Sequence, residues 1–328
     1  MLPVADIRAG PLPPNRFRVA TVYENGQFSL VRVLGAVMQE VRSKAVRGST
    51  NSMLSRLKSQ VGVLLNRDPR ISLRTYALLV RCPLFLPHDA SYLGVRQIFD
   101  VWQPPMPPRD NARPLLLDIG ANNGISSVGF LRLLPAFRVL AIEPNALHAP
   151  SLRRVAKRYP GRFEYRLAAA GADASPGKEI ALFTPFWRSL ALHTLTAARP
   201  EVVLNNVSNS WNIPLDQVSM VETRAPLITV DSLGVSPAIV KIDAEGCETD
   251  IIRGMCSTLD RCHPVLLMEL TSLGAKEAVE LTAGRGYRCF RYDESSGRLM
   301  TDSDQTVSHA VNERNRYFVP PDLCWSFS

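Results

Sequence analysis

The clearest architectural signal in the chain is Leu115-Leu-Leu-Asp-Ile-Gly-Ala-Asn-Asn-Gly124. Its first half is a short apolar run with an acid near its end, which is typical of a buried parallel strand. In its second half Gly120 permits a tight turn, and Gly124 allows the following helix to approach the strand closely. The segment therefore predicts a strand–turn–helix unit, either as a ligand-binding loop or as a bare connection.

Strand and helix signals alternate from this unit toward the C-terminus, which predicts βαβ units and a mostly parallel sheet with helices on both faces. The polar stretch 185–214 has no clear period and is expected to form a loop over the site. Segments 178–184 and 218–223 alternate in polarity and are expected as hairpin strands. The other expected strands are 115–119, 138–143, 163–169, 238–243, 265–270, 287–292 and 316–319, and the helices run to Leu134 and over 151–159, 248–254 and 275–283.

The N-terminal third has a different composition. Residues 1–113 contain 16 Lys+Arg and 7 Asp+Glu, whereas the remaining residues contain 22 and 23. Amphipathic helices are expected at 29–45, 52–65, 72–80 and 92–102, followed by a stiff proline-rich linker at 103–110. We therefore predict a basic, mainly helical extension over 1–110 and a separate α/β domain over 111–328. The helices are expected mainly to pack on that domain, with weak, salt-sensitive contact to anionic membrane surfaces.

The composition limits the class of protein. Hydrophobic residues make up 46% of the 328 residues and charged residues 21%, as in a globular chain with a sizeable core. No apolar stretch is long enough to span a membrane, and the N-terminus lacks the apolar core of a signal peptide. The six cysteines form no C-x-x-C pair, which favours scattered reduced thiols. These features predict a cytoplasmic protein, with peripheral membrane attachment as an addition, and no nucleic-acid partner.

A second acid supports the ligand-binding interpretation of the glycine loop. Glu143 ends the next predicted strand, where a carboxylate can accept hydrogen bonds from both hydroxyls of a ribose. NAD and S-adenosylmethionine both contain such a ribose. Asn122 stands where a dinucleotide fingerprint has its second glycine, which disfavours NAD.

A third motif separates the two cofactors. The chain resembles the FkbM family of S-adenosylmethionine-dependent methyltransferases between about Arg113 and Pro320, in motifs of the same order and spacing. Those motifs are Asp118–Gly124, Ile142-Glu-Pro-Asn145, Thr229-Val-Asp-Ser-Leu233, Lys241-Ile-Asp-Ala-Glu-Gly246 with Glu248, and Leu267-Met-Glu-Leu270. The resemblance does not cover residues 1–112.

The resemblance implies a class I methyltransferase fold: an α/β, Rossmann-like, seven-stranded sheet of order 3-2-1-4-5-7-6 with the last strand antiparallel. It also implies methyl transfer from S-adenosyl-L-methionine, usually O-methylation of a sugar, a glycan or a secondary metabolite. The residues implied to bind the cofactor are Asp118, Gly120, Asn122, Asn123 and Gly124 for the methionine part, Glu143 for the ribose and Ala169 for the adenine. Asn145 is also implied to bind the cofactor.

By the same resemblance, Asp243 and Glu245 lie at the mouth of the site beside the sulfonium. Either acid could take the acceptor's proton, which contributes about 10²–10⁴-fold, although Lys241 opposes the rise in proton affinity that paired acids produce. An equal alternative is that Asp243 orients the cofactor's amino group. His193 is a weaker candidate base.

Two further features have alternative interpretations. Asp243 and Glu269 could hold Mg²⁺ as hard oxygen ligands, which the resemblance does not require. Trp187 and Trp211 flank the expected loop, and we expect them to pack in the core rather than stack on an acceptor. For the whole protein, the alternatives to a methyltransferase are an NAD-dependent oxidoreductase and a non-catalytic binding module that keeps the fold.

Overall fold

The computed structural model describes residues 23–24, 27–28, 95, 97–98, 113–173, 175–187, 190–211, 214–244, 246–270, 275–293, 296, 298–302 and 315–323. The chain divides into two compact units, Met1–Asp68 and Pro69–Ser328. In the first unit, the described residues form an antiparallel hairpin of β1 (Tyr23–Glu24) and β2 (Gln27–Phe28). The helices predicted at 29–45, 52–65 and 72–80 lie outside the described residues.

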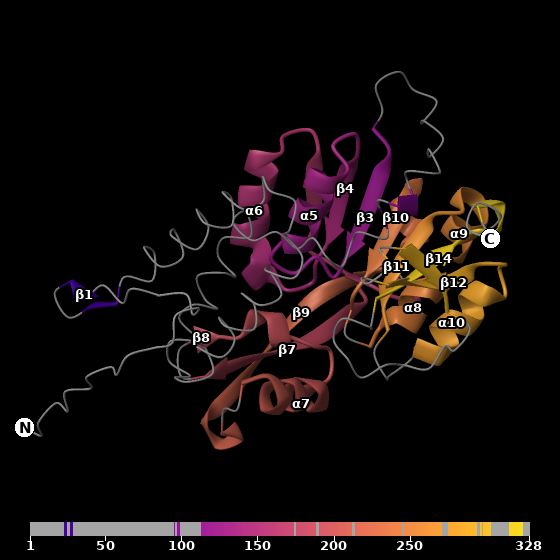
Figure 1. Cartoon of the computed structure of the whole chain (residues 1–328). Helices are drawn as coiled ribbons and strands as arrows, with labels where there is room; N and C mark the ends of the chain where they lie inside the picture. Colours follow the sequence, from indigo (N-terminus) through magenta and orange to yellow (C-terminus); the bar gives the residue numbers. More distant parts are fainter. Residues whose placement is uncertain are drawn as a thin grey trace, which may run out of the picture. The chain divides into compact units, whose positions relative to one another are not determined.

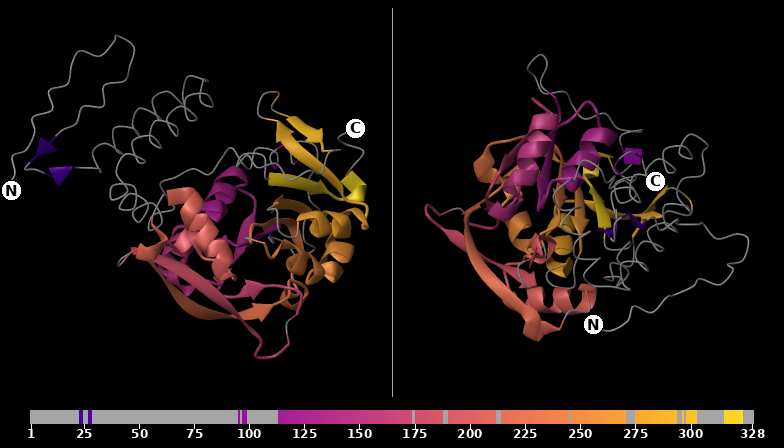
Figure 2. Two further views of the ribbon diagram at one scale, coloured as in Figure 1. Left: turned by 90° about the horizontal axis from the view of Figure 1, so that it is seen from below. Right: turned by 90° about the vertical axis from the view of Figure 1, so that its left-hand side faces the viewer.

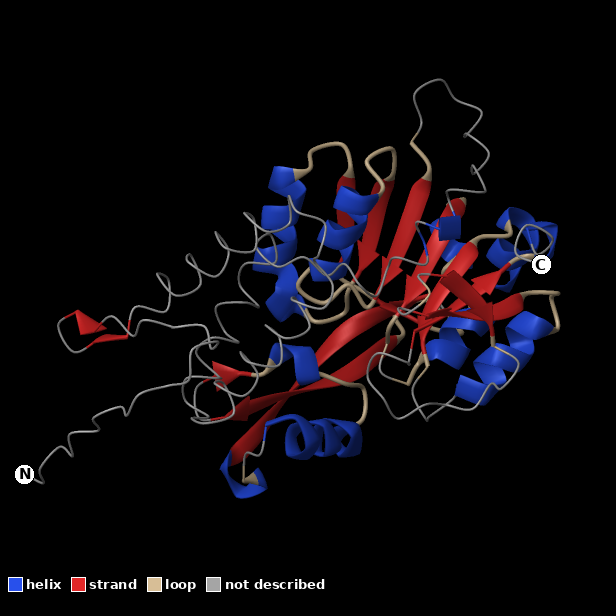
Figure 3. Ribbon diagram, viewed as in Figure 1, coloured by secondary structure: helices blue, strands red, loops and turns tan. Residues whose placement is uncertain are grey.

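An eight-stranded sheet forms the centre of the second unit, with the order β13-β12-β14-β11-β10-β3-β4-β5 (Figure 3). The strands from β11 to β5 pair in parallel, and β14 runs antiparallel to both β11 and β12. This confirms the expected order and the antiparallel last strand, while β13 adds a strand to the seven that were predicted. The strands are β3 (Leu115–Ile119), β4 (Arg138–Ile142), β5 (Phe163–Arg166), β10 (Pro237–Ile242), β11 (Val265–Glu269), β12 (Arg288–Asp293), β13 (Arg298–Thr301) and β14 (Asn315–Val319).

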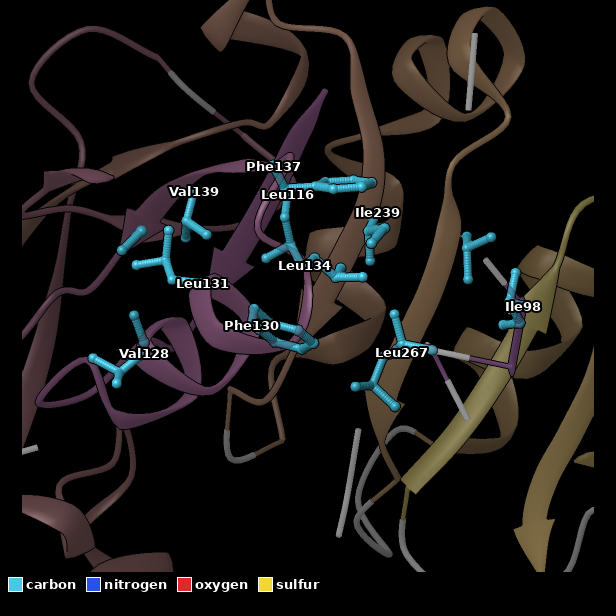
Figure 4. Packing of buried hydrophobic residues seen from close by; sticks show 14 of the residues in the cluster. Ile98, Leu116, Val128, Phe130, Leu131, Leu134, Phe137, Val139, Ile239 and Leu267 are labelled. Atoms are coloured by element: carbon cyan, nitrogen blue, oxygen red, sulfur yellow. The ribbon is translucent and has the colours of Figure 1, made fainter. Parts of the chain in front are cut away.

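Helices cover both faces of this sheet because successive strand residues point to opposite sides. Leu116 of β3 faces α5 and α6, in a cluster with Phe130 and Leu152 (Figure 4). Its neighbours Leu115 and Leu117 belong to the opposite cluster, which α8, α9 and α10 cover. Each fully buried aliphatic side chain contributes about 1.5–3 kcal/mol. The helices are α5 (Ile125–Leu133), η3 (Ala146–His148), α6 (Ala149–Arg158), η6 (Asp231–Leu233), α8 (Glu248–Arg253), α9 (Cys256–Cys262) and α10 (Ala275–Ala283).

The end of the N-terminal extension takes part in this core. Val95, Gln97 and Ile98 are helical, in agreement with the helix predicted at 92–102. Val95 and Ile98 are fully buried in the cluster that contains Phe290 (Figure 4). The amide of Leu299 donates a hydrogen bond of 2.7 Å to Gln97 Oε1. Residues before the predicted boundary at 110 therefore stabilise the central sheet.

A second sheet lies beyond the carboxyl ends of β3 and β4 (Figures 1 and 2). Its order is β6-β9-β7-β8. The long strands β7 and β9, predicted as hairpin strands from alternating polarity, pair antiparallel and extend beyond the predicted ends, but β8, η4 and α7 lie between them in the chain. The third predicted strand, 163–169, is divided: β5 stays in the central sheet, and β6 pairs with β9 instead. The strands are β6 (Ala169–Ala170), β7 (Glu179–Trp187), β8 (Leu190–Ala191) and β9 (Val218–Ile228).

The prediction of a loop over 185–214 was wrong for most of its length. The segment contains β8, η4 (His193–Leu195) and the helix α7 (Pro200–Trp211). Val203 and Val207 are fully buried one helical turn apart and pack with Leu192 and Ala197. This apolar stripe is narrow, and the asparagines and serines around it hid the helical period. The helix packs against its own small cluster under the second sheet.

Candidate functional site

A cavity opens where the carboxyl ends of β3, β4 and β10 meet the second sheet. Ligands of parallel α/β sheets bind at this edge, near the point where the strand order reverses. The amides of Gly120 and Asp243 donate to the carbonyls of Ile142 and Ile119, at 3.0 and 3.1 Å, and so tie the three strand ends together. The cavity is lined by Ile119, Gly120, Asn122, Ile142, Glu143, Pro144, His148, Ala168, Ala169, Ala170, Ile180, Leu182, His193, Thr196, Ala197, Ala198, Asp243, Ala244, Cys247 and Ile251.

Gly120 forms the floor of the cavity between two strand ends. Its φ is +73°, and a Cβ placed on it would lie 1.8 Å from the carbonyl oxygen of Asp243. Only glycine allows the loop after β3 to pass so close to the end of β10. The tight turn predicted from the sequence is therefore required by two strands that lie far apart in the chain.

The rest of the glycine loop divides into one residue at the cavity and two that shape the loop. Asn122 lines the cavity with a left-handed φ of 53°. Asn123 is 5% exposed, and its Oδ1 accepts a hydrogen bond of 3.1 Å from Ile125 N at the start of α5. Gly124 has a φ of +89° and lies against Leu152 and Val155 of α6. From the sequence, a close approach to a strand was expected instead.

Glu143 has a buried carboxylate that two backbone amides hold in place. Its Oε2 accepts from Asn122 N and its Oε1 from Asn145 N, each at 2.7 Å. Burial raises the pKa of Glu143 to about 7, while the two amide hydrogen bonds and the charge of Lys241 oppose that rise. Each oxygen keeps a second lone pair, so the carboxylate can still accept hydrogen bonds from a pair of ligand hydroxyls.

Lys241 connects the two acids at the ends of β3 and β10. Its Nζ lies 3.4 Å from Asp118 Oδ1 and 3.1 Å from Asp243 Oδ2, and it donates to the carbonyl of Gly120 at 3.1 Å. Asp118 is fully buried and also accepts from the hydroxyls of Ser126 and Ser127. Neither Lys241 nor Asp118 is among the lining residues, whereas Asp243 is, with its side chain 36% exposed. Lys241 therefore positions the loop and Asp243, and Asp118 anchors α5.

Asn145 links the Glu143 loop to the second sheet. Its Oδ1 accepts from Leu147 N at 3.0 Å and caps η3. Its Nδ2 donates to Thr196 Oγ1 at 2.9 Å and lies 3.4 Å from Thr184 Oγ1. Asn145 is 1% exposed and does not line the cavity. Asn145 therefore connects the end of β4 to the second sheet.

Two histidines form one wall of the cavity. The rings of His148 and His193 lie edge to face, with centroids 5.5 Å apart. Burial, together with the nearby charge of His193, lowers the pKa of His148 to about 3. His193 was a candidate from sequence, whereas His148 was missed. Its position five residues after Glu143, at the start of the next helix, is the signal that could have identified it.

Glu248 braces the turn that follows Asp243. It is 1% exposed, and its Oε1 accepts from Gly246 N at 3.1 Å. Burial raises the pKa of Glu248, and hydrogen bonds from the turn's own amides oppose the rise. Glu245, which lies within this turn, is outside the described residues.

The remaining sequence candidates lie away from the cavity or outside the description. Ala169 lines the cavity as expected. Trp187 packs against the small cluster under the second sheet and donates to Gln217 Oε1 at 3.3 Å, in agreement with the packing interpretation. The side chain of Trp211 is outside the described residues. Glu269 ends β11, paired with Asn315 of β14. In the described parts of the chain, no three His, Cys, Asp or Glu side chains form a metal-binding group.

Comparison with known proteins gives the family. The model of the family described as "Methyltransferase FkbM domain" matches residues 118–289, more than half of the chain. The chain belongs to the FkbM methyltransferase family. A search of curated proteins finds no match. Among the residues that the structure describes, no helix has the length and apolarity needed to cross a membrane.

Three solved structures illustrate the distance to known relatives of this FkbM-family chain. An FkbM methyltransferase from Methylobacillus flagellatus KT shares 16% identity over 85% of this chain and 65% of that protein, with a TM-score of 0.41. A precorrin-6Y C5,15-methyltransferase from Geobacter metallireducens GS-15 shares 14% identity over 69% of this chain and 84% of the other, at a TM-score of 0.33. A probable spermidine synthase from Corynebacterium glutamicum ATCC 13032 shares 11% identity over 73% and 78%, at a TM-score of 0.31. The chain thus spans 65% of the length of the Methylobacillus protein, and the family assignment rests on the family model.

The residues at the cavity fit a nucleoside cofactor such as S-adenosylmethionine. Gly120 lets the loop after β3 lie against the backbone of Asp243, and the Glu143 carboxylate is already oriented by two amides. Small side chains from Ala168 to Ala170 line the side of the cavity next to Glu143. A hydroxyl acceptor, a small apolar wall and a glycine floor are the features that such a ligand needs.

Proposed function

We propose that the protein transfers a methyl group from S-adenosyl-L-methionine to a hydroxyl oxygen of a small-molecule or glycan acceptor. The observation that carries the proposal is that Gly120, Glu143 and Asp243, from three adjacent strand ends, line one cavity in a chain of the FkbM family. Glu143 is proposed to bind the ribose, the loop from Gly120 to Asn122 the amino-acid part, and Ala169 the adenine side. Asp118, Asn123, Gly124 and Asn145 are proposed to support these contacts.

The cofactor supplies an electrophilic methyl group on a sulfonium, which is an excellent leaving group. The protein is left with three tasks: to orient the acceptor oxygen, to exclude water, and to receive the hydroxyl proton. The apolar side chains of Ile180, Leu182 and Ile251 line the cavity and help to exclude water.

Asp243 is the proposed proton acceptor. Its side chain is partly exposed at the cavity, so an acceptor hydroxyl can reach it. Lys241 contacts Oδ2, which makes Oδ1 the oxygen proposed to take the proton. The alternatives are that Asp243 orients the cofactor's amino group, or that Glu245 or His193 is the base.

The Asp243→Asn variant distinguishes these roles. If Asp243 is the base, turnover falls about 10²–10⁴-fold, while the Kd for S-adenosylhomocysteine stays within about threefold of wild type. Asp250→Asn, at an exposed pair with Arg253, is the matched control and should change neither quantity. A large loss of affinity with normal turnover at saturating cofactor would instead make Asp243 a binding residue.

The first experiment measures the binding of S-adenosylhomocysteine and of NADH by calorimetry. A radiolabelled methyl-transfer screen over glycans, lipids and small metabolites then identifies the acceptor. Binding of S-adenosylhomocysteine alone supports the proposal. Binding of NADH alone would support the oxidoreductase alternative. Binding of neither would support a non-catalytic module.

A further inference from the structure

The second sheet reaches the Glu143 loop through one face of β7. Successive strand residues point to opposite faces, so Ile180, Leu182 and Thr184 share a face. Ile180 and Leu182 line the cavity. Thr184, the next residue on this face, is fully buried and is not among the lining residues. Thr184 can therefore act on a ligand in the cavity only through other residues.

Thr184 belongs to a triangle of polar atoms that connects the two layers. Its Oγ1 lies 3.0 Å from Thr196 Oγ1 and 3.4 Å from Asn145 Nδ2, which donates to Thr196 Oγ1 at 2.9 Å. The orientation of the Asn145 amide is fixed, because its Oδ1 accepts a hydrogen bond from Leu147 N. Asn145 is 1% exposed, and buried donors need partners, so the threonine hydroxyls serve as acceptors for its Nδ2.

The backbone of Asn145 extends this restraint to Glu143. Asn145 N donates to Glu143 Oε1 at 2.7 Å, while Asn122 N holds the other carboxylate oxygen. The amide and the side chain belong to the same residue, so a shift of the Asn145 side chain also moves the donor to Oε1. Because Glu143 lines the cavity, the direction of its carboxylate depends in part on the contact between Asn145 and the threonines of the second layer.

We propose that Thr184 is a positioning residue, which acts through Asn145 to hold the Glu143 carboxylate in the orientation that receives both ribose hydroxyls of the cofactor. This inference rests on the proposed function, in which Glu143 binds the ribose. Hydrogen bonds weaken steeply when donor and acceptor are misaligned, so a loosened Asn145 weakens the ribose contact. The second sheet is then a part of the cofactor site as well as a cover over it.

The test begins with Thr184→Val, which keeps the shape of the side chain and removes the hydroxyl. We expect the Kd for S-adenosylhomocysteine, measured by calorimetry on the full chain, to rise about three- to tenfold. Thr184→Ser keeps the hydroxyl and should stay within about twofold of wild type. Thr223→Val is the matched control on the neighbouring strand β9, because the buried Thr223 Oγ1 has no hydrogen-bond partner among the described residues, and it should leave the Kd unchanged. If Thr184→Val does not fold, Thr184→Ala against Thr184→Ser makes the same comparison.

A double-mutant cycle with Glu143→Ala separates positioning from a general effect on the fold. If Thr184 acts through Glu143, Thr184→Val causes no further loss of affinity in the Glu143→Ala background. An equal loss in both backgrounds would overturn the proposal, as would wild-type affinity in Thr184→Val, and the proposed function would stand in both cases. If wild type did not bind S-adenosylhomocysteine, the proposed function would fall together with the inference.

Discussion

Glu143 combines a buried carboxylate with contacts that keep it ready for a ligand. Burial raises the pKa of Glu143 to about 7, and the charge of Asp118 adds a smaller effect in the same direction, whereas two amide hydrogen bonds and the charge of Lys241 lower it. With a pKa of about 7, the Glu143 carboxyl changes its protonation state within the pH range in which binding is measured. Only the ionised form offers acceptors to both ribose hydroxyls, because the protonated form uses one oxygen as a donor.

We therefore expect the affinity for S-adenosylhomocysteine to fall as the pH is lowered from 8 to 6 through the pKa of Glu143. The loss is up to about tenfold, if the protonated form does not bind. Glu143→Gln should bind weakly and show no such pH dependence. Calorimetry across this range measures both, with the exposed Glu222→Gln as the control that keeps the wild-type profile. A wild-type affinity that does not change with pH would contradict the prediction.

Lys241 is the cation between two acids, and one of those acids is fully buried. Lys241→Met leaves Asp118 without its ion-pair partner, and an uncompensated buried charge costs about 3–5 kcal/mol. Urea unfolding should show this loss. Lys178→Met breaks the exposed pair with Asp173 and should cost less than about 1 kcal/mol. If both substitutions lowered the free energy of unfolding by the same small amount, Lys241 would not stabilise the fold, and its role would be confined to the functional site.

At the scale of elements, acidic side chains outside the cavity hold loops and helix ends in place through hydrogen bonds. Asp231 follows β9 and accepts from Ser257 N, Thr258 N and the Thr258 hydroxyl, at 3.0, 2.8 and 2.7 Å. Burial acts to raise the pKa of Asp231, but these hydrogen bonds hold it below its usual value. The motif around Asp231 is part of the family resemblance, and its role here is to cap the start of α9.

The glycine loop is the element whose geometry is most demanding. In Gly120→Ala, the new Cβ would collide with the backbone of Asp243, so the loop after β3 must move. We expect a loss of affinity for S-adenosylhomocysteine of about 100-fold or more, together with lower thermal stability. Gly161→Ala is the matched control, because Gly161 has a similar φ of +69° with nothing within 4 Å of its Cβ position. It should cost about 1–2 kcal/mol and leave binding intact. Wild-type affinity in Gly120→Ala would contradict this account.

At the scale of the whole molecule, stability measurements locate the start of the folded FkbM-family domain. Val95 and Ile98 are fully buried in the core, and Gln97 pairs with β13. A chain that begins at Pro69 keeps these contacts, whereas one that begins at Asn111 loses them.

We expect the chain that begins at Asn111 to be less stable by about 3–6 kcal/mol, since two buried aliphatic side chains are lost. Urea unfolding followed by circular dichroism compares the two. Val95→Ala and Ile98→Ala in the full chain test the same contacts one at a time. If the chain from Asn111 is as stable as the chain from Pro69, the predicted boundary at 110 is correct.

Much of the fold was predictable because its signals are local. Apolar runs of strand length, a glycine turn and amphipathic helices follow one another from Leu115 onward, and each can be recognised within a few residues. The failures came where the local signal was weak. The buried stripe of α7 consists of two valines among polar residues, and β13 is short and mostly exposed.

By itself, the sequence determined the order of strands and helices and placed Gly120, Glu143 and Asp243 at strand ends, because strand ends can be read from local periodicity. Only the tertiary structure decided which of the other polar residues reach the cavity. Lys241 donates to a carbonyl 121 positions away, Asn145 to a threonine 51 positions away, and Gln97 accepts from an amide 202 positions away. Such contacts depend on which strands pair in the central sheet and on what packs against it, and this packing brings together residues whose separation in the chain carries no periodic signal. For the same reason, His148 and His193 are neighbours only because the second sheet packs over the strand ends.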